Sequence, residues 1–311
     1  MYRNLDYREF LERGSWPVHF RSQLPHPCPI CEFTTEPAGE TAGRRTGRTF
    51  QLQRCIVCGF VFVIDPCTDQ AGAIDAVGLG GKRADAGAAS ECERDDSGRC
   101  IQFYEWRGVE RVARHFLPSG GKWLDYSCGE GGMVRFARAA GRFDVRGFEA
   151  GPCGEKARAN GLPILTEDEL ESHQGTFDFA TSLDVLEHRE DPVAELSKIH
   201  SMLKPGGVLF FLTSNTAGAP ASISKWPRID PEIHASYFNH VSMKVALERG
   251  RFMLKYISWL PGFSDIVRYK TLRCLGVRRR NIFEQAVPWR LVSRLFAARQ
   301  HLVDYSVGIA R

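Results

Sequence analysis

The ten residues 123–132, WLDYSCGEGG, combine a short apolar run, an acidic residue and a loop of small residues. A helical pattern, MVRFARAAGR, follows directly. Glycines let the backbone turn tightly and approach a ligand closely, and the first N–H groups of a helix have no partner within it. The pattern predicts a strand–loop–helix that binds a nucleotide-like cofactor, although such a loop alone is weakly specific.

A second apolar run, VRGFE at 145–149, ends in a carboxylate about twenty residues after this loop begins. In dinucleotide-binding folds a carboxylate at this place accepts hydrogen bonds from ribose hydroxyls. Glu149 is expected to do the same here, and a solvated carboxylate at the end of a strand is the alternative.

Four cysteines form two CxxC pairs, CPIC at 28–31 and CIVC at 55–58, with 23 residues between them. Each pair can supply two thiolates, and four thiolates complete a tetrahedral Zn²⁺ site. No coordination position then remains for water or substrate, so the zinc is expected to be structural. The alternative is a pair of reactive dithiols. The expected ligands are Cys28, Cys31, Cys55 and Cys58. Five other cysteines lack this spacing and are expected to be free thiols: Cys67, Cys92, Cys100, Cys153 and Cys274.

The composition is that of an ordinary globular protein, with 43% hydrophobic and 25% charged residues and a formal net charge of +4. This charge is too mild to require a polyanionic partner. No apolar stretch approaches the ~20 residues that a bilayer crossing needs, and the N-terminus lacks the apolar core of a signal peptide. Together with the paired cysteines, these features favour a cytoplasmic protein with no membrane span.

Three segments are expected along the chain. Residues 1–66 hold a short helix candidate and the zinc-binding module, and residues 67–99 are rich in Gly, Ala and Asp, as in a linker or mobile loop. Residues 100–311 alternate short apolar strands with helical patterns, which predicts an α/β fold with a doubly wound parallel sheet. The expected strands lie near 123–125, 145–149, 164–166, 177–182 and 208–213, and the helices near 101–118, 130–141, 153–160 and 191–203.

The blocks already named are followed by FDFATSLDVLEH at 177–188 and LKPGGVLFFLTSN at 203–215. In this order they resemble the class I S-adenosylmethionine-dependent methyltransferases over roughly residues 100–260. The resemblance implies a Rossmann-like, seven-stranded sheet whose last, antiparallel strand is DYSVGIAR at 304–311. A small zinc-ribbon-like module would precede it, and S-adenosylmethionine would be the cofactor.

The resemblance also assigns cofactor-binding residues. The first loop would lie against the methionine half, and the end of the fourth strand would lie beside the sulfonium. Asp168 would flank the adenine, although a helix-start cluster is the alternative reading of TEDEL, and Tyr104 belongs to a helix that often covers the cofactor. Ser127 stands where the family usually has glycine. The residues so assigned are Asp125, Ser127, Cys128, Gly129, Gly131, Glu149, Asp168, Leu183, Asp184 and Tyr104.

Methyl transfer needs a general base only where the acceptor must lose a proton, and histidine suits this role near neutral pH. His188 ends the DVLEH block, and His234, Tyr237 and His240 lie in DPEIHASYFNHVS. In this fold the segment 214–300 contributes to the acceptor pocket. These four residues are the catalytic candidates, and bracing of loops through their ring atoms is the alternative.

A zinc module joined to such a core resembles two arrangements, bacterial small-molecule or sugar methyltransferases and an RNA methyltransferase type. Arginines at 44, 45, 48 and 54 are diluted by acidic residues at 32, 36, 40 and 65, so a small-molecule acceptor is favoured and a nucleic-acid partner is not expected. A non-catalytic cofactor-binding protein is the third reading. The basic segment 264–280 is expected to be a solvated helix, with an acceptor phosphate or a membrane surface as alternatives. The acceptor, the methylated atom and the oligomeric state stay open.

Overall fold

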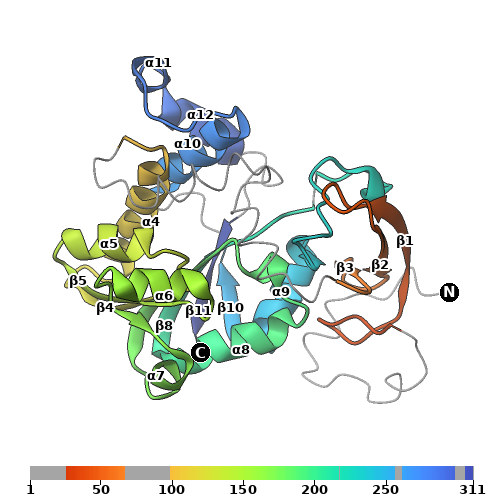
Figure 1. The fold of residues 1–311 in the computed structure, drawn as a ribbon, viewed down its shortest axis with the longest axis horizontal. Coiled ribbons are helices and arrows are strands. Elements are labelled where there is room, and N and C mark those ends of the chain that lie inside the picture. The colour runs from red at the N-terminus through yellow and green to blue at the C-terminus, as the bar shows by residue number, and fades with distance from the viewer. Residues whose placement is uncertain (1–25, 67–98, 217, 256–260, 298–304, 311) are drawn as a thin grey trace. The chain divides into compact units, whose positions relative to one another are not determined.

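The computed structural model describes residues 26–66, 99–216, 218–255, 261–297 and 305–310. The expected N-terminal helix and almost all of the expected linker lie outside these residues. The chain forms two compact units (Figure 1). The smaller unit contains residues 1–70, 186–197 and 214–251, and the larger contains 71–185, 198–213 and 252–311. The smaller unit therefore combines the cysteine module with two segments that the sequence analysis placed in the methyltransferase domain.

The larger unit is built on a sheet in the order β10-β11-β8-β7-β4-β5-β6. Strands β8, β7, β4, β5 and β6 run parallel, whereas β11 is antiparallel to β8 and β10 is antiparallel to β11. This confirms the expected α/β fold with a parallel, Rossmann-like sheet. The strands are β4 (Gly121–Tyr126), β5 (Phe143–Phe148), β6 (Ile164–Leu165), β7 (Phe177–Leu183), β8 (Leu203–Leu212), β10 (Phe252–Lys255) and β11 (Tyr305–Ala310).

Helices in the larger unit pack against this sheet through one apolar cluster, which Trp123 of β4 helps to form. The Trp123 ring meets Phe143 and Phe179 edge-on, with ring centroids 5.6 and 5.3 Å away, and its Nε1 donates to Thr181 Oγ1 at 2.9 Å. The helices are α4 (Gln102–Phe116), α5 (Gly132–Ala139), α6 (Pro152–Ala159), α7 (Glu167–Glu171), α10 (Phe263–Cys274), α11 (Ile282–Gln285) and α12 (Trp289–Ala297). Helix α8 (Pro192–Met202) begins in a segment of the smaller unit and ends in the larger.

The smaller unit holds a four-stranded antiparallel sheet in the order β1-β2-β3-β9. Its strands are β1 (Thr35–Ala42), β2 (Thr49–Cys55), β3 (Val61–Val63) and β9 (Ser236–Tyr237). Alternating inward residues of β2, Phe50 and Leu52, are buried in its core with Tyr237. Helix α9 (His240–Arg249) follows β9, and Asn239 caps it by accepting from the Ser242 N–H at 2.9 Å.

None of the helices in the described ranges combines the length and apolar character that a bilayer crossing requires.

Candidate functional site

The loop after β4 has a backbone that only small residues adopt easily. Ser127, Gly129 and Gly131 have φ angles of +58°, +56° and +78°. Gly131 caps α5, and a Cβ there would lie 2.6 Å from Leu162 Cδ1. The serine at 127 therefore occupies a left-handed conformation that glycine would adopt without strain. Strain of this kind is typical of loops that hold a ligand.

Glu149 connects this loop to the end of β5. Its Oε2 accepts from the Gly129 N–H at 3.1 Å, and its Oε1 accepts from the Gly151 N–H at 3.3 Å. The Cys128 N–H donates to the Phe148 carbonyl at 3.0 Å, so the loop and the strand end are joined twice. Each carboxylate oxygen has two lone pairs, so both retain capacity for a further donor.

Asp125 lies at the end of β4, with only 4% of its surface exposed. Thr181 Oγ1 donates to its Oδ1 at 2.6 Å. Burial raises the pKa of Asp125 to about 7. The hydrogen bond from Thr181 lowers this pKa, and the charge of Glu149 raises it. A buried carboxyl with this pKa is suited to receive a cationic ligand group, which would favour its ionised form.

Leu183 ends β7, and Asp184 follows it with a φ of +54°. The Asp184 carboxylate accepts from Lys270 Nζ at 3.0 and 3.1 Å and from an Arg273 guanidinium N–H at 3.3 Å, both on α10. Lys270 Nζ also lies 3.8 Å from Glu105 of α4, a carboxyl whose pKa burial raises to about 7. The two basic partners of Asp184 were not expected from the sequence, because the segment 264–280 was predicted to be a solvated helix.

Tyr104 and Asp168 are placed less favourably for a cofactor. Tyr104 is fully buried, and its hydroxyl donates to Glu284 Oε1 at 2.7 Å and accepts from Arg280 Nε at 2.8 Å. Asp168 is exposed in the first turn of α7, where Thr166 and Glu169 form a capping box. Both residues thus have structural explanations, and their cofactor roles stay predictions.

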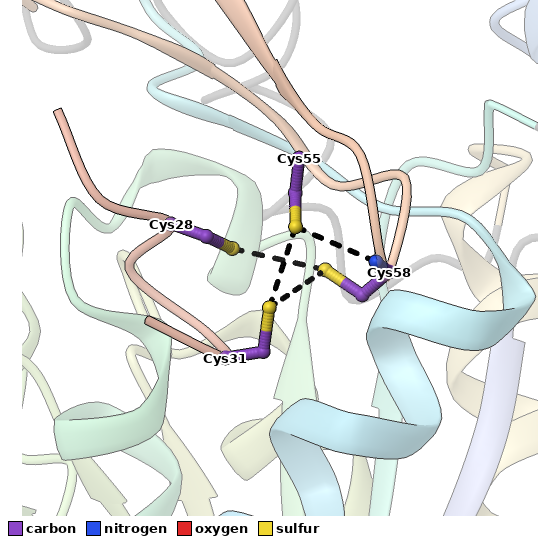
Figure 2. Close-up of side chains that lie close together, drawn as sticks. All are labelled: Cys28, Cys31, Cys55 and Cys58. Carbon is purple, nitrogen blue, oxygen red and sulfur yellow. Dashed lines mark hydrogen bonds between the residues drawn. The ribbon is translucent and has the colours of Figure 1, made fainter. Parts of the chain in front are cut away.

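The two CxxC pairs come together in the smaller unit. The sulfur atoms of Cys31 and Cys55 lie 3.3 Å apart, those of Cys31 and Cys58 3.6 Å, and those of Cys28 and Cys58 3.7 Å. Figure 2 shows the four sulfur atoms pointing toward a common centre. All four side chains are buried, and their sulfur atoms lie within 4.8 Å of one another. This donor set fits one tetrahedral metal ion.

Backbone groups support the cysteine cluster. The N–H groups of Val57 and Cys58 each lie 3.4 Å from Cys55 Sγ, toward which they donate. Gly59 follows with a φ of +70°, as the turn requires. Asn239 Nδ2 donates to the Cys58 carbonyl at 3.1 Å, and Arg249 donates to the Ile30 carbonyl.

The cysteines outside the cluster differ from expectation at one position. Cys153 and Cys274 form no disulfide, as expected, but Cys100 is disulfide-bonded, so the expectation of a free thiol there is wrong. Cys67 and Cys92 lie outside the described residues. The spacing of single cysteines carries no information on disulfide pairing, which is why the sequence could not reveal this bond.

Two predicted histidines lie together in the smaller unit. The ring centroids of His188 and His234 are 4.8 Å apart, and donor atoms of both lie within 4.8 Å of a Glu187 carboxylate oxygen. His188 Nδ1 lies 2.5 Å from the Ile233 carbonyl, which can only accept, so the neutral ring carries its proton on Nδ1. Its Nε2 then carries the lone pair of the neutral ring. Glu187 was not singled out in the sequence, although it adjoins His188.

Tyr237 and His240 are arranged differently. Tyr237 is fully buried, and its hydroxyl accepts from the Asp230 N–H at 3.0 Å. Burial raises the pKa of Tyr237 well above its ordinary value, which disfavours its phenolate as a base. His240 begins α9, and desolvation lowers its pKa. The structure therefore groups His188 and His234 with Glu187 and does not place His240 in that group.

Residues 99–252 match a protein family described as "Methyltransferase domain". Among curated relatives, the ubiquinone biosynthesis O-methyltransferase of Methylococcus capsulatus is 32% identical over 117 residues, which is 34% of this chain and 49% of the relative. The enzyme of the same name from Xanthomonas axonopodis pv. citri is 32% identical over 126 residues, 37% of this chain and 52% of the relative.

The methyltransferase domain thus spans about half the length of the curated relatives it matches. Among solved structures, a methyltransferase in complex with the Trm112 activator of Haloferax volcanii is similar at 18% identity and a TM-score of 0.48. The match covers 73% of this chain and 96% of that one. A likeness of this strength adds nothing to the functional argument.

Proposed function

We propose that this protein transfers a methyl group from S-adenosylmethionine to a hydroxyl oxygen of a small-molecule acceptor. The observation that carries the proposal is the Gly129–Glu149 hydrogen bond, found inside a methyltransferase domain. Relatives of this domain are named as O-methyltransferases of ubiquinone biosynthesis, which supports a small acceptor with a hydroxyl group.

The cofactor would be held by the ends of three strands of the larger unit. Glu149 would accept hydrogen bonds from the ribose hydroxyls, since its two oxygens retain lone pairs. The loop 127–131 and the start of α5 would offer backbone N–H groups to the methionine carboxylate. Asp125 would receive the ammonium group, and Leu183 and Asp184 would border the sulfonium at the end of β7.

Methyl transfer from a sulfonium is an in-line displacement, so alignment of the two reactants supplies most of the acceleration. When bound, S-adenosylmethionine would supply the methyl group to the acceptor oxygen, and the electron pair of the carbon–sulfur bond would stay on sulfur. The acceptor proton must leave, and a histidine of the His188–His234 pair would serve as the base that receives it. His188 follows Asp184 by four positions along the chain.

The cysteine cluster would hold one structural Zn²⁺ through Cys28, Cys31, Cys55 and Cys58. Such an ion stabilises a segment that has a small apolar core of its own. Thiolate–metal sites are common under reducing conditions, and we therefore propose a cytoplasmic location. The disulfide at Cys100 is uncommon in that compartment and is the observation against it.

The contacts of the arginines in the cysteine module weaken the RNA alternative. Arg45 pairs with Asp230 at 2.9 Å and with Glu232 at 3.3 Å, and Arg44 donates to the Pro227 carbonyl. Arg48 donates to the Asp65 carbonyl at 3.2 Å and stacks over Phe50. Much of this basic charge is therefore engaged within the smaller unit itself, and a nucleic acid is not proposed as a partner.

The test is a mass-spectrometric assay of S-adenosylhomocysteine released from S-adenosylmethionine in the presence of a panel of catechols, phenols and sugars. The proposal expects stoichiometric methylation of at least one hydroxyl acceptor. Release of S-adenosylhomocysteine only with a structured RNA would contradict it.

A further inference from the structure

Large apolar side chains are exposed mainly in one part of the larger unit. Of the seven such side chains exposed among the described residues, five lie between 275 and 295. Phe283 is 83% exposed and Ile282 76%, both on α11, and Leu291 and Leu295 of α12 are 57% and 64% exposed. Helix α12 packs against α10, and α11 lies directly before α12 in the chain, as the labels in Figure 1 show. We call this surface the α11–α12 face.

The exposed side of helix α12 carries two stripes of side chains, one apolar and one basic. Ser293 is buried and Val292 packs against the core of the larger unit, which defines the inner side. Residues four apart lie above one another on a helix, so Leu291 and Leu295 form an apolar stripe. Arg290 and Arg294, also exposed and four apart, form a basic stripe next to it.

The exposed charged residues of this face are basic. Residues 275–295 contain five arginines and one acidic residue, Glu284. Glu284 is only 4% exposed, and it accepts hydrogen bonds from Arg268 Nε at 2.7 Å and from Tyr104. Arg290 also lines a groove with Arg111 and Arg114, which form ion pairs with the buried Asp265 and Glu110. The face therefore presents basic and apolar groups together.

The apolar side chains are held outward by their neighbours. Asn281 caps α11 by accepting from the Glu284 N–H at 3.0 Å, and Trp289 Nε1 donates to the Glu284 carbonyl at 2.7 Å. Glu284 of α11 is thus anchored in the interior, whereas the preceding Ile282 and Phe283 are exposed. Their exposure is thus part of the fold of this segment.

We propose that the α11–α12 face docks on the surface of an anionic lipid bilayer. Leucine and phenylalanine side chains would enter the boundary between headgroups and acyl chains, while the arginines contact lipid phosphates. The positive charge without exposed acidic residues fits an anionic membrane better than a neutral apolar partner. Docking of this kind would bring the enzyme to acceptors that partition into the membrane.

The test is co-sedimentation of the full chain with vesicles of phosphatidylcholine alone or with one quarter phosphatidylglycerol. The proposal expects binding to the anionic vesicles that weakens with added salt. The double variant Arg290→Gln/Arg294→Gln is expected to bind roughly 30-fold more weakly, since each arginine near an anionic surface contributes about fivefold. The double variant Leu291→Ser/Leu295→Ser is expected to lose at least tenfold.

Met253→Ser, at an exposed methionine on β10, and Arg142→Gln, at an exposed arginine outside the face, are the matched controls and should bind as the unaltered protein does. Far-ultraviolet circular dichroism and S-adenosylmethionine binding of each variant verify its folding. Equal binding by all variants, or no binding to anionic vesicles, overturns the proposal. A dimer in sedimentation velocity that the leucine variant abolishes, without vesicle binding, overturns it in favour of a second copy of the chain.

Discussion

The backbone N–H of Gly129 donates to Oε2 of Glu149 at 3.1 Å, which ties the loop after β4 to the end of β5. Two residues that are 20 positions apart in the chain thereby share one site at the carboxyl ends of parallel strands. Ligands of open α/β sheets bind at this edge, and we therefore propose that the pair marks the cofactor site.

Substitution of Ser127 tests whether the strained loop conformation affects stability and cofactor binding. Ser127→Val should lower the free energy of unfolding by about 1–2 kcal/mol, because a β-branched residue tolerates a φ of +58° poorly. It should also weaken S-adenosylmethionine binding, whereas Ser127→Gly should retain both properties. Chemical denaturation and calorimetry measure the two effects, and a valine variant that matches the serine protein in both would contradict this account of the loop.

Loss of one cysteine ligand should remove the metal. Cys58→Ser is expected to reduce the zinc content from one ion per chain to nearly none and to lower the melting temperature, because binding free energy of a structural ion is folding free energy. Plasma mass spectrometry gives the zinc content. Cys274→Ser, at an exposed free cysteine, is the control and should keep the full content. Equal metal content in the two variants would show that the cluster is not the metal site.

The raised pKa of Asp125 predicts a pH dependence. Its pKa is about 7 in the folded protein and 3.8 ordinarily, so the folded state binds more protons between these values. Stability should therefore fall as the pH rises from about 4 to about 7, by a few kcal/mol at most, and level off above that range. The Asp125→Asn variant should lack this contribution, and denaturation at several pH values compares the two proteins.

The same carboxyl links cofactor binding to protons. An ammonium group beside Asp125 favours the ionised form, so S-adenosylmethionine binding at pH 6 should release a proton. Calorimetry in buffers of different ionisation enthalpy detects this release. Asp125→Asn should abolish it, whereas Glu105→Gln, a change to the neighbouring buried carboxyl of raised pKa, should leave it in place. Unchanged release in the Asp125 variant would assign the proton to another group.

Substitution of either histidine in the His188–His234 pair is expected to slow catalysis. Once an acceptor is known, His234→Asn and His188→Asn should each lower kcat by about 10²–10⁴-fold, the usual contribution of a general base. His115→Gln, at an exposed histidine of α4, is the control. A loss of less than about threefold in both variants lies far below the contribution of a general base and would remove the pair from the mechanism.

Local sequence patterns were sufficient for the parts of the site that depend on neighbouring residues. The WLDYSCGEGG loop forms with positive φ at three positions, and each CxxC pair brings two thiols together within four residues. The carboxylate of Glu149 could be placed because parallel strands end at a common edge.

Contacts between distant segments could not be predicted in the same way. Lys270 reaches Asp184 across 86 positions, and this pairing depends on how α10 packs. Strand β9 pairs with β3 of the cysteine module. It is only two residues long, which is too short for the alternation of apolar and polar residues that identifies a strand in a sequence. The strand expected near 208–213 is longer than predicted, because β8 begins at Leu203 and follows α8 directly.

The most direct test of the central claim is calorimetric titration of the purified full chain with S-adenosylmethionine. Glu149→Ala and Glu149→Gln are the comparison variants, because the first removes both acceptor oxygens and the second keeps one. The account predicts micromolar binding that weakens at least tenfold in the alanine variant and less in the glutamine variant, as expected when hydrogen bonds to a charged group are lost. Absence of binding to the unaltered protein, or equal affinity in all three, would contradict the cofactor site proposed at the Gly129–Glu149 pair.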